Sequence, residues 1–267
     1  LVTFLWRGDQ QNVRILGSPY IGHEHLSRMA NSQLWYLSYL LPNDTRLSYQ
    51  LAPNVPQLGK GHKQAQRRAV LAKIQADPFN LHPWQASSSL ALAAHENDKH
   101  LVATVQPKGR ISTSAFSSEH LENTRDITIY RPNLAYSLSP SPPLLIVLDG
   151  GAYQSKVPLI TILDNLIASK QLPPLHAVFI HNAKASLRYQ ELTPNSAYSA
   201  FIAEELFPWL KNTQHISSEP SKTTITGSSL GGLAALYIAT EHPTLIANVL
   251  SQSGSFWWGK DDQSQWL

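Results

Sequence analysis

Cysteine is absent from the 267 residues of the chain. Disulfides, thiolate zinc sites, iron–sulfur clusters and a cysteine nucleophile are therefore excluded for these residues. Charge is also scarce: 21 Lys and Arg stand against 18 Asp and Glu, and charged residues make up only 15% of the chain. Because the net charge is only +3 and no run of basic residues could follow a phosphate backbone, no nucleic-acid partner is predicted.

Long hydrophobic runs are missing as well. No apolar stretch approaches the roughly 20 residues of a transmembrane helix, so no membrane span is predicted. Hydrophobic residues nevertheless make up 42% of the chain, which is enough for a substantial core, and the length suits a small domain joined to a medium one. The first residue is Leu1 rather than Met, which leaves open a processed signal peptide and with it a periplasmic protein.

The first part of the chain, residues 1–117, is predicted to be β-rich. Aromatic, strand-like runs at 34–40 and 46–51 flank the turn sequence Pro42-Asn43-Asp44, a pattern that predicts a hairpin. Residues 63–76 have a helical pattern, which Asp77-Pro78 should end, because the proline ring keeps the preceding residue out of the helical conformation.

The second part, residues 118–267, changes to a βαβ rhythm. Residues 144–148 form a continuous apolar run, which is typical of a strand buried on both faces. Further strands are predicted at 125–131, 176–180, 223–226 and 246–250, with helices at 159–167, 198–210 and 230–239. Strands that alternate with helices favour a mostly parallel sheet with flanking helices.

The run Gly227-Ser228-Ser229-Leu230-Gly231 matches the G-x-S-x-G pattern of a nucleophile elbow. It follows a β-branched segment and precedes an apolar helix, which is the strand-turn-helix setting that an elbow needs. We expect Ser229 at the tip of the turn as the nucleophile, and the amide of Leu230 as an oxyanion donor at the helix start. The alternative is a glycine-rich helix cap in a βα turn without catalytic function.

A second oxyanion donor is expected after an earlier strand. Asp149-Gly150-Gly151 directly follows the apolar run 144–148, and its small residues let the backbone bend over the site. The amide of Gly151 is the candidate donor. An ordinary turn at the end of the strand is the alternative.

A serine nucleophile needs a histidine base and an acid that orients it. His242, the only histidine after Ser229, is interpreted as a helix terminus, and Asp261 and Asp262 as residues of a solvated loop. We therefore expect the acid and the base in sequence beyond residue 267.

Further residues are candidates for substrate binding. Arg188 follows the strand at 176–180 and could hold anionic or catecholate oxygens, or instead form a buried pair with Glu191. Trp257 and Trp258 follow the last strand and could form an apolar wall, with core packing as the alternative for at least one of them. His23-Glu24-His25 has no third ligand, so no metal site is predicted.

Taken together, these segments resemble the enterochelin (ferric enterobactin) esterase family over nearly the whole chain. The run from Gly227 to Gly232 and the later Leu250-Ser251-Gln252-Ser253-Gly254-Ser255-Phe256-Trp257-Trp258 are specific in their order and spacing. The other matching stretches are Thr3-Phe4-Leu5-Trp6-Arg7, Leu34-Trp35-Tyr36, Arg46-Leu47-Ser48-Tyr49, Asp77-Pro78-Phe79-Asn80, Val147-Leu148-Asp149-Gly150, and Arg188 with Glu191-Leu192.

The resemblance implies a β-sandwich amino-terminal domain, residues 1–117, before an α/β-hydrolase domain, residues 118–267. It implies a cytoplasmic serine esterase that cleaves the trilactone esters of a ferric catecholate siderophore without a cofactor, since the iron arrives with the substrate. Ser229 matches the nucleophile of the family, Arg188 a substrate-site arginine, and the amides of Leu230 and Gly151 the oxyanion hole.

The chain departs from the family pattern at two points. The base of the family lies in a later Gly-Gly-His segment without a counterpart here, and bulky residues often stand where this chain has Gly151-Ala152. Two other functions stay open. One is a carboxylesterase or acyltransferase of the same fold acting on another ester, and the other is a non-catalytic siderophore- or glycan-binding protein.

Overall fold

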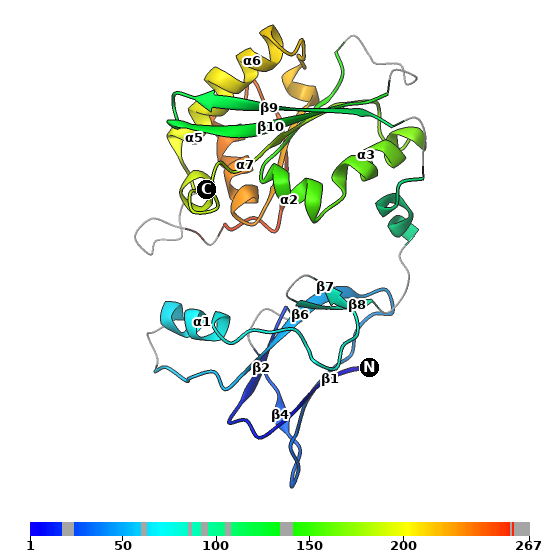
Figure 1. Cartoon of the computed structure of the whole chain (residues 1–267), viewed down its shortest axis with the longest axis vertical. Helices are drawn as coiled ribbons and strands as arrows, with labels where there is room; N and C mark the ends of the chain where they lie inside the picture. Colours follow the sequence, from blue (N-terminus) through cyan, green and yellow to red (C-terminus); the bar gives the residue numbers. More distant parts are fainter. Residues whose placement is uncertain are drawn as a thin grey trace. The chain divides into compact units, whose positions relative to one another are not determined.

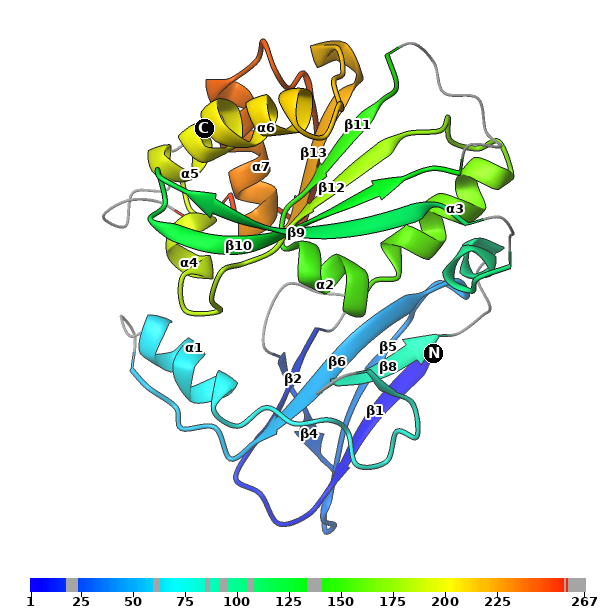
Figure 2. The ribbon, with the colours of Figure 1, turned by 45° about the horizontal axis from the view of Figure 1, so that its top comes forward.

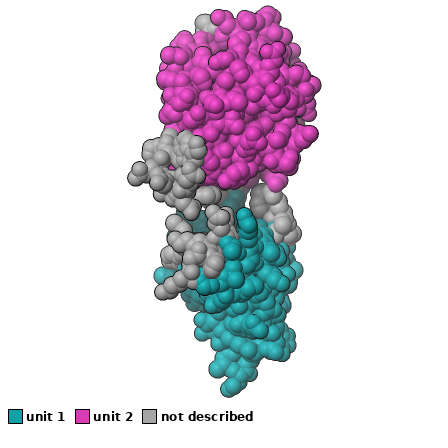
Figure 3. Space-filling view, turned by 90° about the vertical axis from the view of Figure 1, so that its left-hand side faces the viewer, with its two compact units in different colours: residues 1–98 teal, residues 99–267 magenta. Residues whose placement is uncertain are grey.

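The structure is a computed structural model that describes residues 1–17, 24–59, 63–84, 87–91, 96–104, 108–133, 141–256 and 258 (Figure 1). The chain divides into two compact units, residues 1–98 and 99–267, which are coloured separately in Figure 3. A 3-10 helix, η1 (Glu96–Leu101), runs across the division.

The first unit contains two antiparallel sheets. A three-stranded sheet has the order β1-β5-β4, and a five-stranded sheet has the order β3-β2-β6-β8-β7. The strands are β1 (Val2–Arg7), β2 (Val13–Leu16), β3 (Glu24–His25), β4 (Ser27–Arg28), β5 (Leu34–Tyr39), β6 (Arg46–Pro53), β7 (Pro83–Trp84) and β8 (Ser87–Ala91). The only α-helix among the described residues of this unit is α1 (Lys63–Leu71).

Aromatic side chains join the two sheets into a sandwich-like core. The ring of Phe4, on β1, packs edge-on against Tyr49, on β6, with 4.6 Å between ring centroids, and against Tyr39, on β5, at 5.8 Å. Alternate residues of β1 and β5 are buried, as expected of strands with one face on a core. The aromatic residues of the amino-terminal part therefore hold its two layers together.

Two sequence predictions in this unit are wrong. The strands β5 and β6 do not form a hairpin with each other, because β5 pairs with β1 and β4, whereas β6 pairs with β2 and β8. The helix α1 ends at Leu71 rather than at residue 76. Gln75 instead exchanges two backbone hydrogen bonds with Leu51, each 2.9 Å long, which draws the segment into an extended conformation.

The second unit is built on one six-stranded sheet of order β14-β13-β11-β12-β10-β9. The first four strands in that order are parallel, and β10 runs antiparallel to both of its neighbours. The strands are β9 (Arg110–Ser118), β10 (Asn123–Arg131), β11 (Leu144–Val147), β12 (His176–Ile180), β13 (Thr223–Ser228) and β14 (Asn248–Gln252).

Helices cover both faces of this sheet (Figure 2). The helices are α2 (Gly150–Ser155), α3 (Leu159–Ala168), α4 (Arg188–Glu191), α5 (Ser196–Ala200), the π-helical turn η2 (Phe201–Leu206), α6 (Phe207–Asn212), the 3-10 turn η3 (Pro220–Lys222) and α7 (Leu230–Glu241). Ile180 belongs to a buried cluster with residues of α5, η2, α6 and α7, whereas its neighbour Phe179 belongs to a second cluster with residues of α2 and α3. The expected mostly parallel sheet with flanking helices is confirmed.

The second unit begins earlier in the chain than the boundary that the sequence predicts after residue 117. Strand β9 pairs with β10 from Arg110 to Ser118, so its contacts place it in the second unit, which begins at Lys99. Among the described residues, no helix has the length and apolar character needed to cross a membrane.

Candidate active site

Ser229 occupies a sharp turn between the end of β13 and the start of α7. Its φ of 58° and ψ of −118° lie outside the conformations that residues with side chains usually adopt. Two backbone hydrogen bonds hold it there: its N–H donates to the carbonyl of Gln252 and its carbonyl accepts from Ser255, both at 3.0 Å. The turn leaves Ser229 exposed, with its Oγ 3.1 Å from Oγ of Ser255.

The glycines of the motif are required by close backbone contacts. A Cβ on Gly227 would lie 2.5 Å from both the carbonyl carbon and the carbonyl oxygen of Gly231. The helix therefore starts directly against the strand that precedes it, which is the packing of a nucleophile elbow.

The loop after β11 lies beside this elbow. The N–H of Leu148 donates to the carbonyl of Thr226 at 2.9 Å, and a Cβ on Gly231 would be 3.2 Å from Oδ2 of Asp149. Leu230 and Gly151 both belong to the first turn of a helix, whose amides have no intrahelical acceptor. Positive ends of two helix dipoles therefore meet at this edge of the sheet.

Arg188, on α4, donates to Asp149 rather than to Glu191. Its Nε and Nη2 donate to Oδ1 and Oδ2 of Asp149, each at 2.7 Å, and these hydrogen bonds raise the pKa of the guanidinium. Asn182 adds a third hydrogen bond of 2.7 Å to Oδ1. The alternative interpretation of an Arg188–Glu191 pair is wrong, while substrate binding by Arg188 stays a prediction.

Glu191 has a different partner on the sheet. Arg125, on β10, donates to both carboxylate oxygens of Glu191 at 2.7 and 3.2 Å, and both side chains are almost fully buried. The guanidinium carbon of Arg125 also lies 5.4 Å from the ring centroid of Tyr198 and 5.1 Å from that of Phe201. This pair fixes α4, and with it Arg188, against the sheet.

Trp258 packs against the core of the second unit and donates from Nε1 to the hydroxyl of Tyr189 at 3.0 Å. Trp257, Asp261 and Asp262 lie outside the described residues. The expected role of the tryptophans in substrate binding stays a prediction.

Sequence reasoning missed a partner network around His181. This residue directly follows β12, and its Nε2 lies 3.0 Å from Oγ1 of Thr128 and 3.2 Å from Nε2 of Gln154. Burial lowers the pKa of the imidazole, against a smaller opposing effect of Asp126. Its place at the carboxyl end of a parallel strand, where ligands of α/β proteins bind, was the signal that could have drawn attention to it.

A second missed contact links α2 to the last strand. The hydroxyl of Tyr153 donates to Oε1 of Gln252 at 2.7 Å, and burial, together with the charge of Asp149, raises the pKa of this tyrosine. Because Gln252 also accepts the backbone N–H of Ser229, the contact connects the loop after β11 to the turn that carries the serine.

The remaining histidine predictions concern His242 and the His23-Glu24-His25 segment. Helix α7 ends at Glu241 and His242 caps it, so its interpretation as a helix terminus is confirmed. His23 lies outside the described residues, and Glu24 accepts a hydrogen bond from the hydroxyl of Tyr39. Within the described part of the chain, no three His, Asp or Glu side chains are grouped as metal ligands would be.

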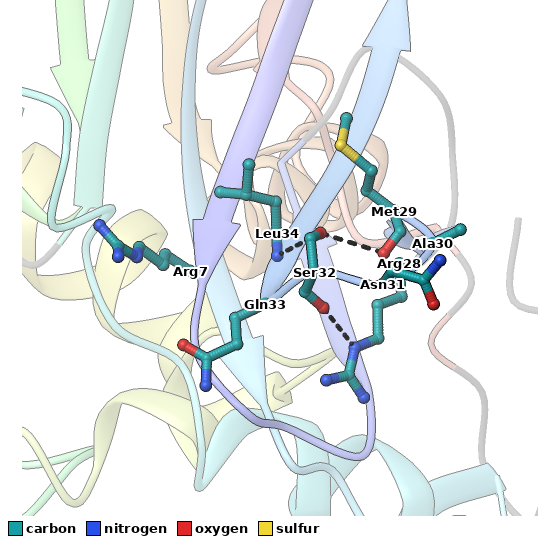
Figure 4. A pocket seen from close by; sticks show the side chains of 8 residues that line it. All are labelled: Arg7, Arg28, Met29, Ala30, Asn31, Ser32, Gln33 and Leu34. Carbon is teal, nitrogen blue, oxygen red and sulfur yellow. Dashed lines mark hydrogen bonds between the residues drawn. The ribbon is translucent and has the colours of Figure 1, made fainter.

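The first unit has a surface hollow of about 870 Å³ at the β4–β5 turn (Figure 4). Arg28 is held there by Oδ1 of Asp9 at 2.9 Å and by the carbonyl of Ser32 at 3.0 Å. The lining residues are Arg7, Arg28, Met29, Ala30, Asn31, Ser32, Gln33 and Leu34. None of the site residues expected from the sequence is among them.

Two family models match the chain along its length. Residues 118–267 match a family described as a putative esterase, and residues 1–100 match the amino-terminal domain of enterochelin esterases. The chain belongs to the enterochelin esterase family. Its second unit is thus an esterase-family hydrolase domain with the serine at the elbow.

Curated relatives carry the name of the same family. The chain is 30% identical to iron(III) enterobactin esterase of Dickeya dadantii (strain 3937) and 29% identical to that of Escherichia coli (strain K12), with 96% of this chain covered in both cases. It spans 66% and 70% of the length of those proteins, or about two thirds.

A solved structure of the family has the same fold. The enterobactin esterase FES from Shigella flexneri, crystallised in the presence of enterobactin, superposes with a TM-score of 0.73 at 26% sequence identity. The match covers 98% of this chain and 72% of the FES chain.

Proposed function

We propose that this protein is a serine esterase that hydrolyses the trilactone of ferric enterobactin or of a related catecholate siderophore, and so releases the iron. The observation that carries the proposal is the backbone of Ser229, held at a φ of 58° between β13 and α7 in a chain that matches both parts of an enterochelin esterase. The proposed compartment is the cytoplasm, as the family resemblance implies.

The proposed reaction is acyl transfer in two steps. Oγ of Ser229 attacks the ester carbonyl carbon while a general base takes its proton, and the carbonyl oxygen becomes an oxyanion. Collapse of this intermediate breaks the ester C–O bond, and the leaving alkoxide takes up a proton. Water then attacks the acyl-enzyme and releases the carboxylic acid, which returns Ser229 to its starting state.

The oxyanion is assigned to the backbone amides of Leu230 and Gly151. Both amides lie in the first turn of a helix, at the edge of the sheet where the elbow lies. Such preorganised donors stabilise the oxyanion of the transition state more than they stabilise the neutral carbonyl of the substrate. Catecholate oxygens are assigned to Arg188, whose Nη1 takes no part in the two hydrogen bonds to Asp149. Trp257 and Trp258 are assigned to the apolar side of the same substrate site.

The test compares full-length wild-type protein with the variants Ser229→Ala and Ser228→Ala. The two serines are adjacent, and both are exposed, so Ser228→Ala is a matched control. Ferric enterobactin is incubated with each protein, and linear trimer, dimer and monomer are separated by chromatography. We expect products from wild type and from Ser228→Ala, and a loss of at least about 10³-fold in rate for Ser229→Ala.

A simple acyl ester and a fluorophosphonate probe complete the test. Hydrolysis of the simple ester without cleavage of the trilactone would support a serine hydrolase but show that its substrate is a different ester. Failure of the probe to label Ser229, together with inertness towards both esters, would favour a binding protein instead.

A further inference from the structure

The absence of a side chain at Gly151 uncovers one edge of the His181 ring. A Cβ at this position would lie 3.4 Å from Nδ1 of His181 and 3.9 Å from its Cε1, which is ordinary van der Waals contact. Apart from the adjoining residues and the backbone of α2, no other described atom would lie within 4 Å of this Cβ. The ring of His181 therefore borders open space beside the amide assigned to the oxyanion.

The hydrogen bonds of Nε2 determine which ring nitrogen carries the proton. Nε2 lies 3.2 Å from the side-chain amide nitrogen of Gln154, and an amide nitrogen can only donate. Nε2 therefore accepts, and a neutral imidazole must carry its proton on Nδ1. Burial, which lowers the pKa of His181, keeps the ring in this neutral form at pH 7.

The ring is held by elements on both sides. Thr128, which is 1% exposed on β10, places Oγ1 3.0 Å from Nε2, and its hydroxyl is itself 2.9 Å from that of Thr113, on β9. Gln154 approaches from α2, the helix that begins with Gly150 and Gly151. The direction of the Nδ1–H bond is thus fixed before any ligand arrives.

We propose that Nδ1–H of His181 donates a hydrogen bond to an oxygen of the bound substrate beside the scissile ester, and that His181 is a specificity-determining residue of this site. The inference rests on the proposed function. A catecholate trilactone carries amide carbonyl and phenolate oxygens near each ester carbonyl, whereas in a simple acyl ester such as 4-nitrophenyl acetate the only other acceptors are the weakly accepting nitro oxygens at the far end of the ring. The hydrogen bond from His181 therefore favours the trilactone over the simple ester as substrate.

The experiment measures kcat/KM of the full-length protein for ferric enterobactin and for 4-nitrophenyl acetate. His181→Phe keeps a planar ring without the N–H donor, and His181→Asn replaces the ring by a shorter side chain with an N–H group. The matched control is His120→Phe, an exposed histidine paired with Glu204, which should leave both activities unchanged.

We expect the ratio of the two kcat/KM values, trilactone over simple ester, to fall about tenfold in His181→Phe. A rise in KM for the trilactone should carry most of this change, and His181→Asn should recover the ratio to within about threefold. A wild-type ratio in His181→Phe, in a protein that cleaves the trilactone, would overturn the inference and leave the proposed function standing. A wild-type protein that does not cleave the trilactone would overturn both.

A second measurement does not depend on a histidine variant that folds. In the ¹⁵N NMR spectrum of the Ser229→Ala protein, we expect the Nδ1–H resonance of His181 to shift when gallium-loaded enterobactin, a diamagnetic analogue, is added, while the Nε2–H resonance of His120, which faces Glu204, stays in place. An unchanged His181 resonance at saturating ligand would contradict the proposal.

Discussion

Arg188 holds Asp149 by two parallel hydrogen bonds, Nε to Oδ1 and Nη2 to Oδ2, each 2.7 Å long. Asp149 caps α2 with a φ of 55°, and its Oδ2 lies against Gly231 at the start of α7. The pair therefore ties α4 to both of the helix starts that supply the candidate oxyanion amides. Bidentate pairing of this kind fixes orientation as well as distance.

Loss of this clamp is expected to lower both stability and activity. The Arg188→Met variant would leave the carboxylate of Asp149, whose side chain is only 9% exposed, without its cation. We expect the free energy of unfolding to fall by about 2–4 kcal/mol and kcat to fall with it. Urea unfolding and steady-state kinetics on the full-length protein measure the two effects.

The matched variant for the clamp is the double substitution Arg188→Met with Asp149→Asn. It removes the charge that the single variant leaves unpaired, so part of the lost stability should return. Equal stability of wild type and Arg188→Met would show that the clamp does not hold the loop.

The buried pair of Arg125 and Glu191 should be more sensitive still. Their side chains are 0% and 5% exposed, so Arg125→Met leaves an uncompensated charge inside the protein. We expect a loss of about 3–5 kcal/mol in the free energy of unfolding. Arg28 and Asp9 form the control pair, because they are largely exposed, and Arg28→Met should cost less than about 1 kcal/mol. Similar losses in the two variants would contradict the prediction.

The elbow should not tolerate a methyl group at Gly227. A Cβ there would meet backbone atoms of Gly231 at 2.5 Å, and backbone has little freedom to move away. We expect Gly227→Ala to lower the free energy of unfolding by about 1–3 kcal/mol and to reduce the rate of ester hydrolysis, because the turn must open. Gly59→Ala is the control: it places its methyl in open space and should change stability by less than about 0.5 kcal/mol.

Acid should destabilise the second unit through the buried His176 and the half-buried His181. Burial lowers the pKa of both His176 and His181 below the usual value, and the charge of Arg131 adds to the effect at His176. Between the lowered native pKa values and about pH 6.5, the unfolded chain binds more protons than the native state. The free energy of unfolding therefore rises with pH in this range, and stability is lost as the pH falls below about 6.5.

Urea unfolding at several pH values between 7.5 and 5 checks this sign. We expect His176→Phe and His181→Phe each to reduce the pH slope, which for one full proton is about 1.4 kcal/mol per pH unit. A slope as steep in both variants as in wild type would assign the acid sensitivity to other groups.

Local patterns were sufficient to predict the sheet of the second unit and its elbow. Strands such as β11 and β12 are apolar on both faces, and the residues of the elbow are consecutive, so their arrangement depends on neighbours in sequence. The strand positions at 144–147 and 176–180 and the helix after Ser229 were all found this way.

Contacts between distant residues could not be predicted from these patterns. The prediction of a β5–β6 hairpin is wrong because each of the two strands pairs with other strands, and the two belong to different sheets. Likewise Glu191 follows Arg188 by three residues on one helical turn, yet it turns inward to Arg125, 66 residues earlier. Turn residues and helical spacing carry no information about such partners.

The sequence by itself determined the family, the two-part organisation and the serine at the elbow, because these depend on short runs of residues whose backbone preferences are local. Only the tertiary structure decided that Arg188 clamps Asp149, that Glu191 belongs to Arg125 and that His181 presents Nδ1 beside Gly151. Each of these contacts joins residues from different strands and helices. Their distances are set by how the sheet packs against its helices, which no single segment specifies.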